Sequence, residues 1–394
     1  MEDGMARKVR STKKAKKKAT KKVAKKATKK TAKKSTKKVS KKTAKKAVKK
    51  TAKKTTKKAT KKVAKKAAKQ ATKKTTKKAT KKVAKKVAKK ASKKLTVSPK
   101  QSQKELFDSL LELIRVTSTV LPDDIQKVIL EALEKEQKDT SAEYALKIIE
   151  ANIKLAKMKS QPMCQDTGTI LFFVNHPPGF RQNDFVKVCN KAVLKATEVG
   201  YLRQNSVDSL TGKNDCMNVG LGHPNYHFHE HNKSHVEVRL MLKGGGCENV
   251  GIQYSLPDKT IGAGRDLDGV RRAILDGVHK AQGMGCGPGV LGVCIGGDRS
   301  AGYVESKEQL LRKLDDSNSH PDLDHLEKDI VETSNKLGIG PMGFGGNTTL
   351  LGCKIGVLNR LPASFFVSIS YMCWAYRRQG VKLKSNNQVS QWLY

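Results

Sequence analysis

The first 94 residues of this 394-residue chain lack Leu, Ile, Phe, Tyr, Trp and Cys. A segment without large apolar side chains cannot bury a hydrophobic core, so we predict that residues 1–94 are disordered. The whole chain has no run of 18 apolar residues, which excludes a membrane-spanning helix, and its N-terminus lacks the apolar core of a signal peptide. The eight Cys contain no CxxC pair, which argues against a secreted disulfide scaffold. We therefore expect reduced thiols or a metal centre in a cytoplasmic protein.

Acidic residues are also nearly absent from the N-terminal segment. Residues 1–100 hold 46 Lys and Arg but 2 Asp and Glu, whereas residues 101–394 hold 35 and 33. From Lys13 to Lys94 the chain repeats Lys-Lys-x-x, with one lapse at Gln70. This period of four winds Lys around a helix of 3.6 residues per turn and places Lys beside Lys at i+4, which destabilises the helix.

Paired ammonium groups at regular spacing can neutralise phosphates, which gives nucleic-acid affinity that is independent of sequence and steeply dependent on salt. No aromatic residue is interleaved, so stacking on single strands is not expected. The segment resembles the Lys/Ala-rich tails of linker histones and the histone-like proteins of some intracellular bacteria. We predict that residues 13–94 bind nucleic acid, with association with the nucleoid as a consequence. A solubilising extension or the product of repeat expansion is the alternative.

The remaining residues have the composition of a folded domain of the α+β class. Residues 95–104 read as a linker, 105–385 as the domain and 386–394 as a C-terminal extension. Three amphipathic helices open the domain, and a capping-box spacing from Thr140 to Glu143 marks the start of the third. The predicted strands are 169–174, 235–242, 290–295, 350–357 and 365–372. The predicted helices that accompany them are 184–199, 268–282, 305–314 and 323–337.

Three glycine-rich segments, three Cys and a His cluster are the candidates for chemistry. The glycine-rich segments are 243–247, 283–289 and 338–346, and each could be an anion cradle or a turn. From their spacing alone, Cys164, Cys286 and Cys373 cannot be told from buried structural thiols. The His residues between His223 and His235 could bind Zn or Ni from one strand face, although a half-exposed strand or interface edge is the more ordinary interpretation.

Five motifs occur in an order that identifies a family. They are PMCQDTG, KGGGCEN, GCGPG followed by IGGDRS, GPMGFGGNTT, and PASFFVSISYMCWAYRR. This ordered set resembles the α part of class I (iron–sulfur) fumarate hydratases and the related tartrate dehydratase α subunit, over about residues 102–385. The resemblance implies a mixed α/β core and a 4Fe–4S cluster held by Cys164, Cys286 and Cys373.

The resemblance also implies roles for other residues. Asp166 is the expected acid/base group beside the open iron, because dehydration requires one proton to leave carbon and another to reach the leaving hydroxyl. The substrate carboxylates are expected to contact Gln165, Arg203 and the backbone of Gly244, Gly245 and Gly246. Two positions depart from the family: Cys247 stands where Ser is usual, and Leu361 stands where many members have His.

The chain ends without the smaller C-terminal domain of the longer family members. We therefore expect a separate β subunit to supply the remaining groups within a higher oligomer. The leading hypothesis is the α subunit of a hydro-lyase that interconverts fumarate and malate, acting on a C4 dicarboxylate. A tartrate dehydratase α subunit is the close alternative, and a nucleoid-associated DNA-binding protein is an alternative of a different class.

Overall fold

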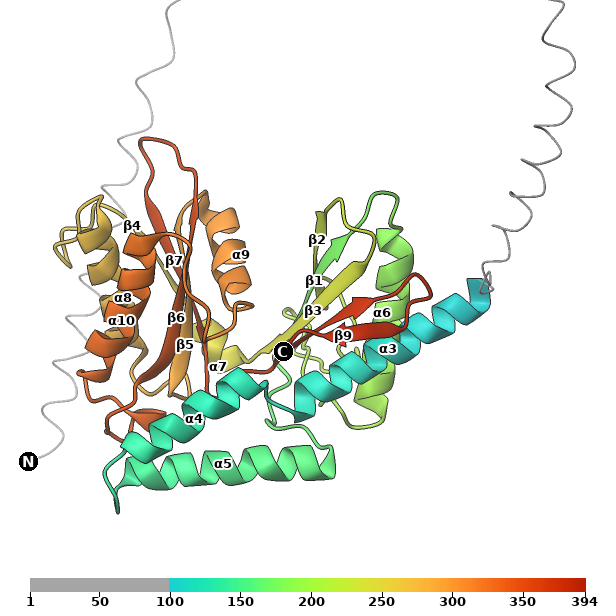
Figure 1. Cartoon of the computed structure of the whole chain (residues 1–394), viewed down its shortest axis with the longest axis horizontal. Helices are drawn as coiled ribbons and strands as arrows, with labels where there is room; N and C mark the ends of the chain where they lie inside the picture. The colour runs from blue at the N-terminus through green and yellow to red at the C-terminus, as the bar shows by residue number, and fades with distance from the viewer. Residues whose placement is uncertain (1–98) are drawn as a thin grey trace, which may run out of the picture. The chain divides into compact units, whose positions relative to one another are not determined.

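The computed structural model describes residues 99–394 of the chain, with side chains from residue 101. The predicted tetrad-repeat tail, residues 1–94, lies outside these described residues. Helices accompany two separate mixed sheets, which confirms the α+β expectation. Figure 1 shows the two sheets, with the three N-terminal helices along one edge of both. No helix among the described residues is long and apolar enough to cross a membrane.

Three helices open the described chain: α3 (Pro99–Thr119), α4 (Asp123–Lys135) and α5 (Ser141–Lys159). The capping box at the start of α5 is present, because Thr140 accepts a hydrogen bond from the Glu143 N–H at 3.3 Å. The Glu143 carboxylate in turn accepts from the Asp139 N–H at 3.0 Å. α3 begins at Pro99, so residues 99–104 of the expected linker are helical.

The first sheet has five strands in the order β2-β1-β3-β8-β9. Their bounds are β1 (Thr169–His176), β2 (Asn225–Glu230), β3 (Val236–Lys243), β8 (Arg378–Leu383) and β9 (Val389–Trp392). Helices α3 and α6 (Gln182–Glu198) pack on each other against one face. Alternate residues of β1 enter two cores: Phe172 belongs to the core with α3 and α6, and Phe173 to the core of the second sheet.

The second sheet has four strands in the order β4-β7-β5-β6. Their bounds are β4 (Ile252–Ser255), β5 (Gly289–Gly296), β6 (Leu350–Leu358) and β7 (Phe366–Met372). Every residue of β5 is buried, as expected for a strand covered on both faces. The covering helices are α8 (Leu267–Ala281), α9 (Arg299–Gln309) and α10 (Pro321–Asn335), and Figure 1 shows α9 on the opposite side of this sheet from α8 and α10.

The sequence-based element bounds differ from the structure in several places. The predicted helix 305–314 is α9, which begins at Arg299 because the Asp298 carboxylate caps the N–H groups of Ser300 and Ala301 at 2.7 and 2.9 Å. It ends before Leu310, which packs in the core from the following turn. Strands β4, β8 and β9 and the short helix α7 (Gly245–Asn249) were not predicted. Within the expected C-terminal extension, β9 pairs with β8.

Candidate active site

Strand registers bring four distant loops to one place. Thr169 pairs with Lys243, so the loop before β1 lies beside the segment that follows β3. Val290 pairs with Met372, so the loop before β5 lies beside the segment that follows β7. The Leu242 N–H donates to the Arg377 carbonyl at 3.0 Å, which joins the two pairs of loops. The site therefore lies where strand ends of both sheets meet.

Each of these loops carries a cysteine near the meeting point: Cys164, Cys247, Cys286 and Cys373. Burial raises the pKa of the Cys286 thiol, and the neighbouring Cys247, Cys164 and Asp166 raise it further. A hydrogen bond with Cys247 and burial raise the pKa of Cys373, and the charges of Cys247 and Cys164 raise it further. The three cysteines predicted from the motifs are thus close together, and Cys247 joins them as a fourth.

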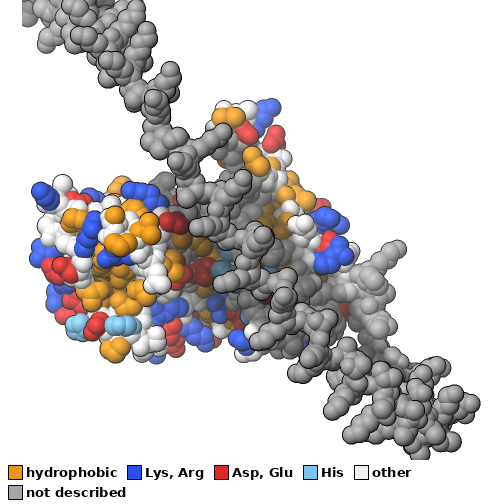
Figure 2. All heavy atoms as spheres, turned by 90° about the horizontal axis from the view of Figure 1, so that it is seen from above, with side chains coloured by type: hydrophobic (Ala, Val, Ile, Leu, Met, Phe, Trp, Pro, Cys, Tyr) orange, Lys and Arg blue, Asp and Glu red, His pale blue; other side chains and the backbone are white. Residues whose placement is uncertain are grey.

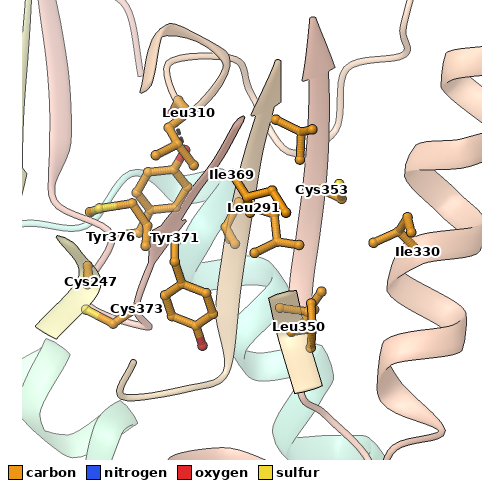
Figure 3. Packing of buried hydrophobic residues seen from close by; sticks show 14 of the residues in the cluster. Cys247, Leu291, Leu310, Ile330, Leu350, Cys353, Ile369, Tyr371, Cys373 and Tyr376 are labelled. Carbon is orange, nitrogen blue, oxygen red and sulfur yellow. Dashed lines mark hydrogen bonds between the residues drawn. The ribbon is translucent and has the colours of Figure 1, made fainter. Parts of the chain in front are cut away.

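Cys247 and Cys373 are the buried pair of this group, and Figure 3 shows them side by side beyond the end of the strand that carries Tyr371. A hydrogen bond from Cys373 lowers the pKa of the Cys247 thiol to about 7, against the effect of burial. The same hydrogen bond and burial raise the pKa of Cys373. The pair is therefore arranged to carry negative charge on one sulfur.

Two buried cations face this pair. Lys243 is 0% exposed, and its Nζ lies 3.1 Å from Glu248 Oε2, while Lys307 holds Glu248 Oε1 at 2.8 Å. Arg377 is 1% exposed, and its Nε and Nη1 have no hydrogen-bond partner among the described residues. The positive charge of Arg377 lowers the pKa of both buried thiols, although stronger influences raise that of Cys373. We call Lys243, Cys247, Cys373 and Arg377 the floor of the site.

Asp166 is held by three hydrogen bonds. Its Oδ1 accepts from the Gly168 N–H at 2.8 Å and from the Asn205 side chain at 2.7 Å, and its Oδ2 accepts from the Gly245 N–H at 2.7 Å. Gly168 has φ +75°, and a Cβ there would collide with the backbone carbonyl of Lys243. Close packing of this glycine on the end of β3 thus sets the position of Asp166.

Gln165 and Arg203 lie next to Asp166 and are exposed. The Arg203 guanidinium donates to the Gln165 carbonyl at 3.1 Å. Thr167 accepts from the Arg203 N–H at 2.9 Å and donates to the Arg203 carbonyl at 2.7 Å, so both loops are tied together. We call Gln165, Asp166, Arg203 and the exposed Cys286 the rim of the site.

The loop that carries Cys286 is shaped by an aromatic ring. Tyr371 packs on Gly285 and Gly289, and a Cβ at Gly285 would lie 2.5 Å from this ring. Cys286 itself has φ 55°, and the Trp374 N–H donates to its carbonyl at 3.4 Å. The third glycine-rich segment supports the same loop, because the Met342 N–H donates to the Gly287 carbonyl at 3.0 Å. The glycines of 283–289 therefore serve close packing around the thiol.

Two members of the His cluster, His227 and His229, lie on β2, an edge strand that is half-exposed, as the more ordinary interpretation of the sequence has it. His227 stacks on Phe173 with ring centroids 4.7 Å apart, and His229 lies 3.0 Å from Glu308. His223 accepts from the Ile170 N–H at 3.3 Å, so it supports the sheet. Within residues 99–394, no three His, Cys, Asp or Glu side chains are grouped to hold a single metal ion.

Sequence reasoning missed three residues of the site: Lys243, Asn205 and Arg377. Lys243 precedes the three glycines and Arg377 follows Cys373 by four positions, but only the fold shows that both are buried. Asn205 follows Arg203 by two positions and reaches Asp166 from an exposed loop. Leu361, at the position of the His that many members have, is exposed in the segment between β6 and β7.

Comparison with known proteins defines the class of the chain. The family model described as fumarate hydratase (Fumerase) matches residues 107–382. The chain belongs to this family, which confirms the resemblance stated from the five motifs.

The relatives fall into two groups by length, because the match covers 57% of one of them and 98% and 91% of two others. A protein of Geobacillus stearothermophilus named as a class I fumarate hydratase is 52% identical over 295 residues, and the match covers 74% of this chain and 57% of that protein. A protein of Methanocaldococcus jannaschii named as an L(+)-tartrate dehydratase subunit alpha is 33% identical, with 71% of this chain and 98% of that protein covered. The L(+)-tartrate dehydratase subunit alpha of Escherichia coli (strain K12) is 29% identical, with 71% and 91% covered.

Proposed function

We propose that the chain is the α subunit of an iron–sulfur hydro-lyase that interconverts fumarate and malate. The observation that carries this proposal is the convergence of four thiols and two buried cations beside Asp166, in a member of the fumarate hydratase family. All eight Cys of the described chain are free thiols, which suits a reducing compartment such as the cytoplasm.

The residues of the site fit a 4Fe–4S cluster. Such a cluster is held by thiolates and is larger than a single metal ion, so thiols around one space suit it even though they do not surround one ion. Two of the three guanidinium nitrogens of Arg377, Nε and Nη1, are buried without a hydrogen-bond partner among the described residues, and a buried charge is unfavourable without hydrogen bonds and a counter-charge. An anionic group bound by Cys164, Cys286 and Cys373 would supply that counter-charge. When bound by three thiolates, the cluster has one iron free to act as a Lewis acid on a substrate hydroxyl.

Asp166 is the proposed acid/base residue. The N–H groups of Gly168 and Gly245 and the Asn205 amide fix the orientation of its carboxylate. These contacts leave the carboxylate at the partly exposed edge of the site, where it can reach a substrate proton. Proton transfer by a positioned carboxylate contributes about 10²–10⁴-fold to a rate.

The substrate carboxylates are proposed to bind at the rim. One N–H of the Arg203 guanidinium donates to the Gln165 carbonyl. The other N–H groups of this exposed guanidinium can donate to a carboxylate. Among the three glycines of the 243–247 segment, Gly245 already donates to Asp166. Gly244 and Gly246 are therefore the members of that set left to approach the substrate. A C4 dicarboxylate, with one acid group at each end, suits two separate sets of donors.

A separate β subunit is proposed to complete the enzyme, within a higher oligomer. The relatives named as α subunits are matched over 98% and 91% of their length. The longer relative named as a class I fumarate hydratase is matched over 57% of its length. The part of that protein beyond the match is what a second chain would provide. The relatives that are matched over nearly their whole length are named as tartrate dehydratase α subunits. Tartrate dehydration is therefore the alternative activity of the site.

Anaerobic purification together with the proposed β subunit tests this function. We expect a brown protein that hydrates fumarate more efficiently than it dehydrates tartrate. The reverse substrate preference would favour the tartrate alternative. Absence of bound iron after anaerobic reconstitution would refute the iron–sulfur proposal, as would unchanged activity of the Cys286→Ala variant.

We also propose that residues 13–94 bind nucleic acid and so associate the enzyme with the nucleoid. The supporting observation is the separation of charge along the chain, 46 Lys and Arg against 2 Asp and Glu in residues 1–100. Figure 2 shows that charges of both signs are interspersed on the visible face of the described residues. DNA affinity should fall steeply with salt and vanish when residues 1–94 are deleted. Affinity that survives the deletion would refute this second function.

A further inference from the structure

The loop between α6 and β2 carries two side chains of the thiol site. This described loop, residues 199–224, contains neither helix nor strand, and a loop of this length is more often functional than a simple connection. From it, Arg203 donates to the Gln165 carbonyl, and Asn205 donates to Asp166 Oδ1 at 2.7 Å. Both side chains are exposed. Exposed side chains do not fix their own position, so the loop needs an anchor inside the protein.

Asn218 is that anchor, because it is 0% exposed and its side chain bonds to the loop on both sides. Its Oδ1 accepts from the N–H groups of Asn205 at 2.8 Å and Ser206 at 3.1 Å. Its Nδ2 donates to the Arg203 carbonyl at 2.7 Å and to Thr197 Oγ1, at the end of α6, at 3.1 Å. A side-chain amide has two donors and two acceptor positions, so this amide is fully used within the protein.

The partners of Asn218 require an asparagine. The N–H groups of Asn205 and Ser206 can only donate, so the oxygen of the amide must face them. The Arg203 carbonyl can only accept, so the nitrogen must face it. The backbone of Asn218 has φ 62°, in the left-handed region that Asn and Gly adopt more readily than other residues.

His223 and Thr167 hold the same anchor from the first sheet. The Ile170 N–H donates to His223 Nε2 at 3.3 Å, so the ring proton lies on Nδ1, which donates to the Asn218 carbonyl at 2.8 Å. Thr167 also donates to the Arg203 carbonyl, at 2.7 Å. The anchor is thus tied to the start of β1, beside the loop that carries the proposed acid/base residue.

We propose that Asn218 is a positioning residue of the thiol site: its buried amide places Arg203 for a substrate carboxylate and, through Asn205, orients the Asp166 carboxylate. One side chain thereby controls a binding contact and a proton transfer, although its own polar atoms are fully occupied within the protein. This inference rests on the proposed hydro-lyase function.

Kinetics of the iron-loaded enzyme, assembled with the proposed β subunit, test the proposal. Asn218→Gly removes the amide without straining the backbone, because Gly accepts a positive φ. Its kcat/KM for fumarate should fall about 10²-fold, through a higher KM and a lower kcat, because small misplacements of positioned groups have effects of this size. Its iron content should be unchanged, because Asn218 is not among the proposed ligands.

The matched control is Asn387→Gly. Asn387 also has a positive φ, of 67°, and its amide also holds a distant segment, through bonds to the Ser102 carbonyl at 3.0 Å and hydroxyl at 2.7 Å. It lies in the turn between β8 and β9, outside the site. This variant should keep the kcat and KM of the wild type.

Two further variants separate positioning from a general loss of stability. Asn218→Asp keeps an acceptor for the Asn205 and Ser206 N–H groups but has no donor for the Arg203 carbonyl, so KM should rise more than kcat falls. The double variant Asn205→Ala/Asn218→Gly should have the kcat of Asn218→Gly within about two-fold, because the effect on kcat passes through Asn205. Independent effects would multiply instead.

Hydrogen–deuterium exchange of the iron-free, full-length chain tests the hydrogen bonds themselves. The amides of Asn205 and Ser206 should exchange about 10-fold faster in Asn218→Gly than in the wild type, and at the wild-type rate in Asn387→Gly. Unchanged exchange in Asn218→Gly, its unchanged kcat and KM, or multiplying effects in the double variant would each overturn the proposal. A wild-type enzyme inactive on both fumarate and tartrate would refute the proposed function and the inference that rests on it, whereas these outcomes with an active wild type refute the inference alone.

Discussion

The floor and the rim of the thiol site come from the same loops but have opposite surroundings. The floor is shielded from solvent, because Lys243 and Arg377 are almost wholly buried around two buried thiols. The rim is in contact with solvent, because Gln165, Arg203 and Cys286 are exposed. A charge in the floor acts strongly because little water screens it, whereas the rim can exchange protons and ligands with solvent. Under the proposed function, the floor would supply counter-charge to a bound anionic group, and the rim would supply Cys286 as one of its ligands together with the contacts to the substrate.

The largest expected effect is a difference in iron content and activity between variants of Cys286, which is exposed, and Cys247, which is buried. Cys286→Ala at the rim should lose iron and reduce activity by more than about 100-fold, the upper effect of removing a group that only supports a ligand. Cys247→Ser in the floor restores the residue usual in the family and should retain both iron and activity. Iron analysis and activity of the two variants, purified anaerobically in parallel, check this contrast. An equal loss of iron in Cys247→Ser would make Cys247 a ligand.

The Asp166→Asn variant should lose catalytic rate but keep its bound iron. The amide keeps the size of the side chain but cannot accept a proton, so kcat should fall by about 10²–10⁴-fold. Iron content should be unchanged, because Asp166 is not among the proposed ligands. Asn205→Ala is the matched change, since it removes one donor to Asp166 and should lower kcat by about 10-fold or less. Equal kcat values for Asp166→Asn and the wild type would exclude the acid/base role.

Glu248→Gln should destabilise the floor. It removes the carboxylate that faces the buried Lys243, at a cost of about 1–3 kcal/mol in the free energy of unfolding, since Glu248 is partly exposed. Burial alone would raise the pKa of Glu248, but Lys243 and Lys307 outweigh it and lower that pKa. The stabilisation is thus present above the unfolded pKa and is lost as pH falls through the lower folded value.

Urea unfolding of the iron-free protein between pH 3 and 7 measures this loss. The difference between wild type and Glu248→Gln should shrink toward the acid end of the range. Glu150→Gln, which removes an exposed pair with Lys154, is the control and should cost less than about 0.5 kcal/mol at any pH. A difference that does not depend on pH would contradict an electrostatic role for Glu248.

Arg377→Met is the smallest expected change, and its two effects should have opposite signs. Arg377 is a buried cation with two nitrogens that lack a hydrogen-bond partner among the described residues, so its removal should stabilise the iron-free protein by about 1 kcal/mol or more. The same change should weaken iron retention by about 10-fold, because the bound anionic group loses a counter-charge. Thermal melts of the iron-free protein and iron release to a chelator measure the two effects. A variant that is less stable without iron would show that Arg377 has a counter-charge of its own.

Much of the fold could be predicted from the sequence where periodicity is strong. The capping box and apolar spacing indicate α5, and the apolar runs indicate β5 and β7. Strand β8 escaped prediction because Arg378 and Gln379 read as surface residues, although both are buried. α9 was misplaced because the Asp298 cap lies before the apolar pattern begins.

The site could be predicted only in part. The order of the motifs indicates Cys164, Cys286 and Cys373, because it reflects a family rather than a local pattern. Burial of a cation depends on strand register between distant segments, and a single sequence does not reveal it. Lys243 and Arg377 were missed for this reason.

The strand registers that unite the loops also set an order of events during synthesis. Cys164 precedes β1 and Cys247 lies within α7, whereas Cys373 follows β7 and is made after every strand except β8 and β9. The nascent chain therefore cannot present the full set of thiols until every strand except β8 and β9 has been translated. Loading of the proposed iron–sulfur cluster would then wait for Cys373, and Cys286 is exposed in the folded chain, where a delivered cluster could reach it. A cluster donor would recognise the folded domain rather than a linear peptide.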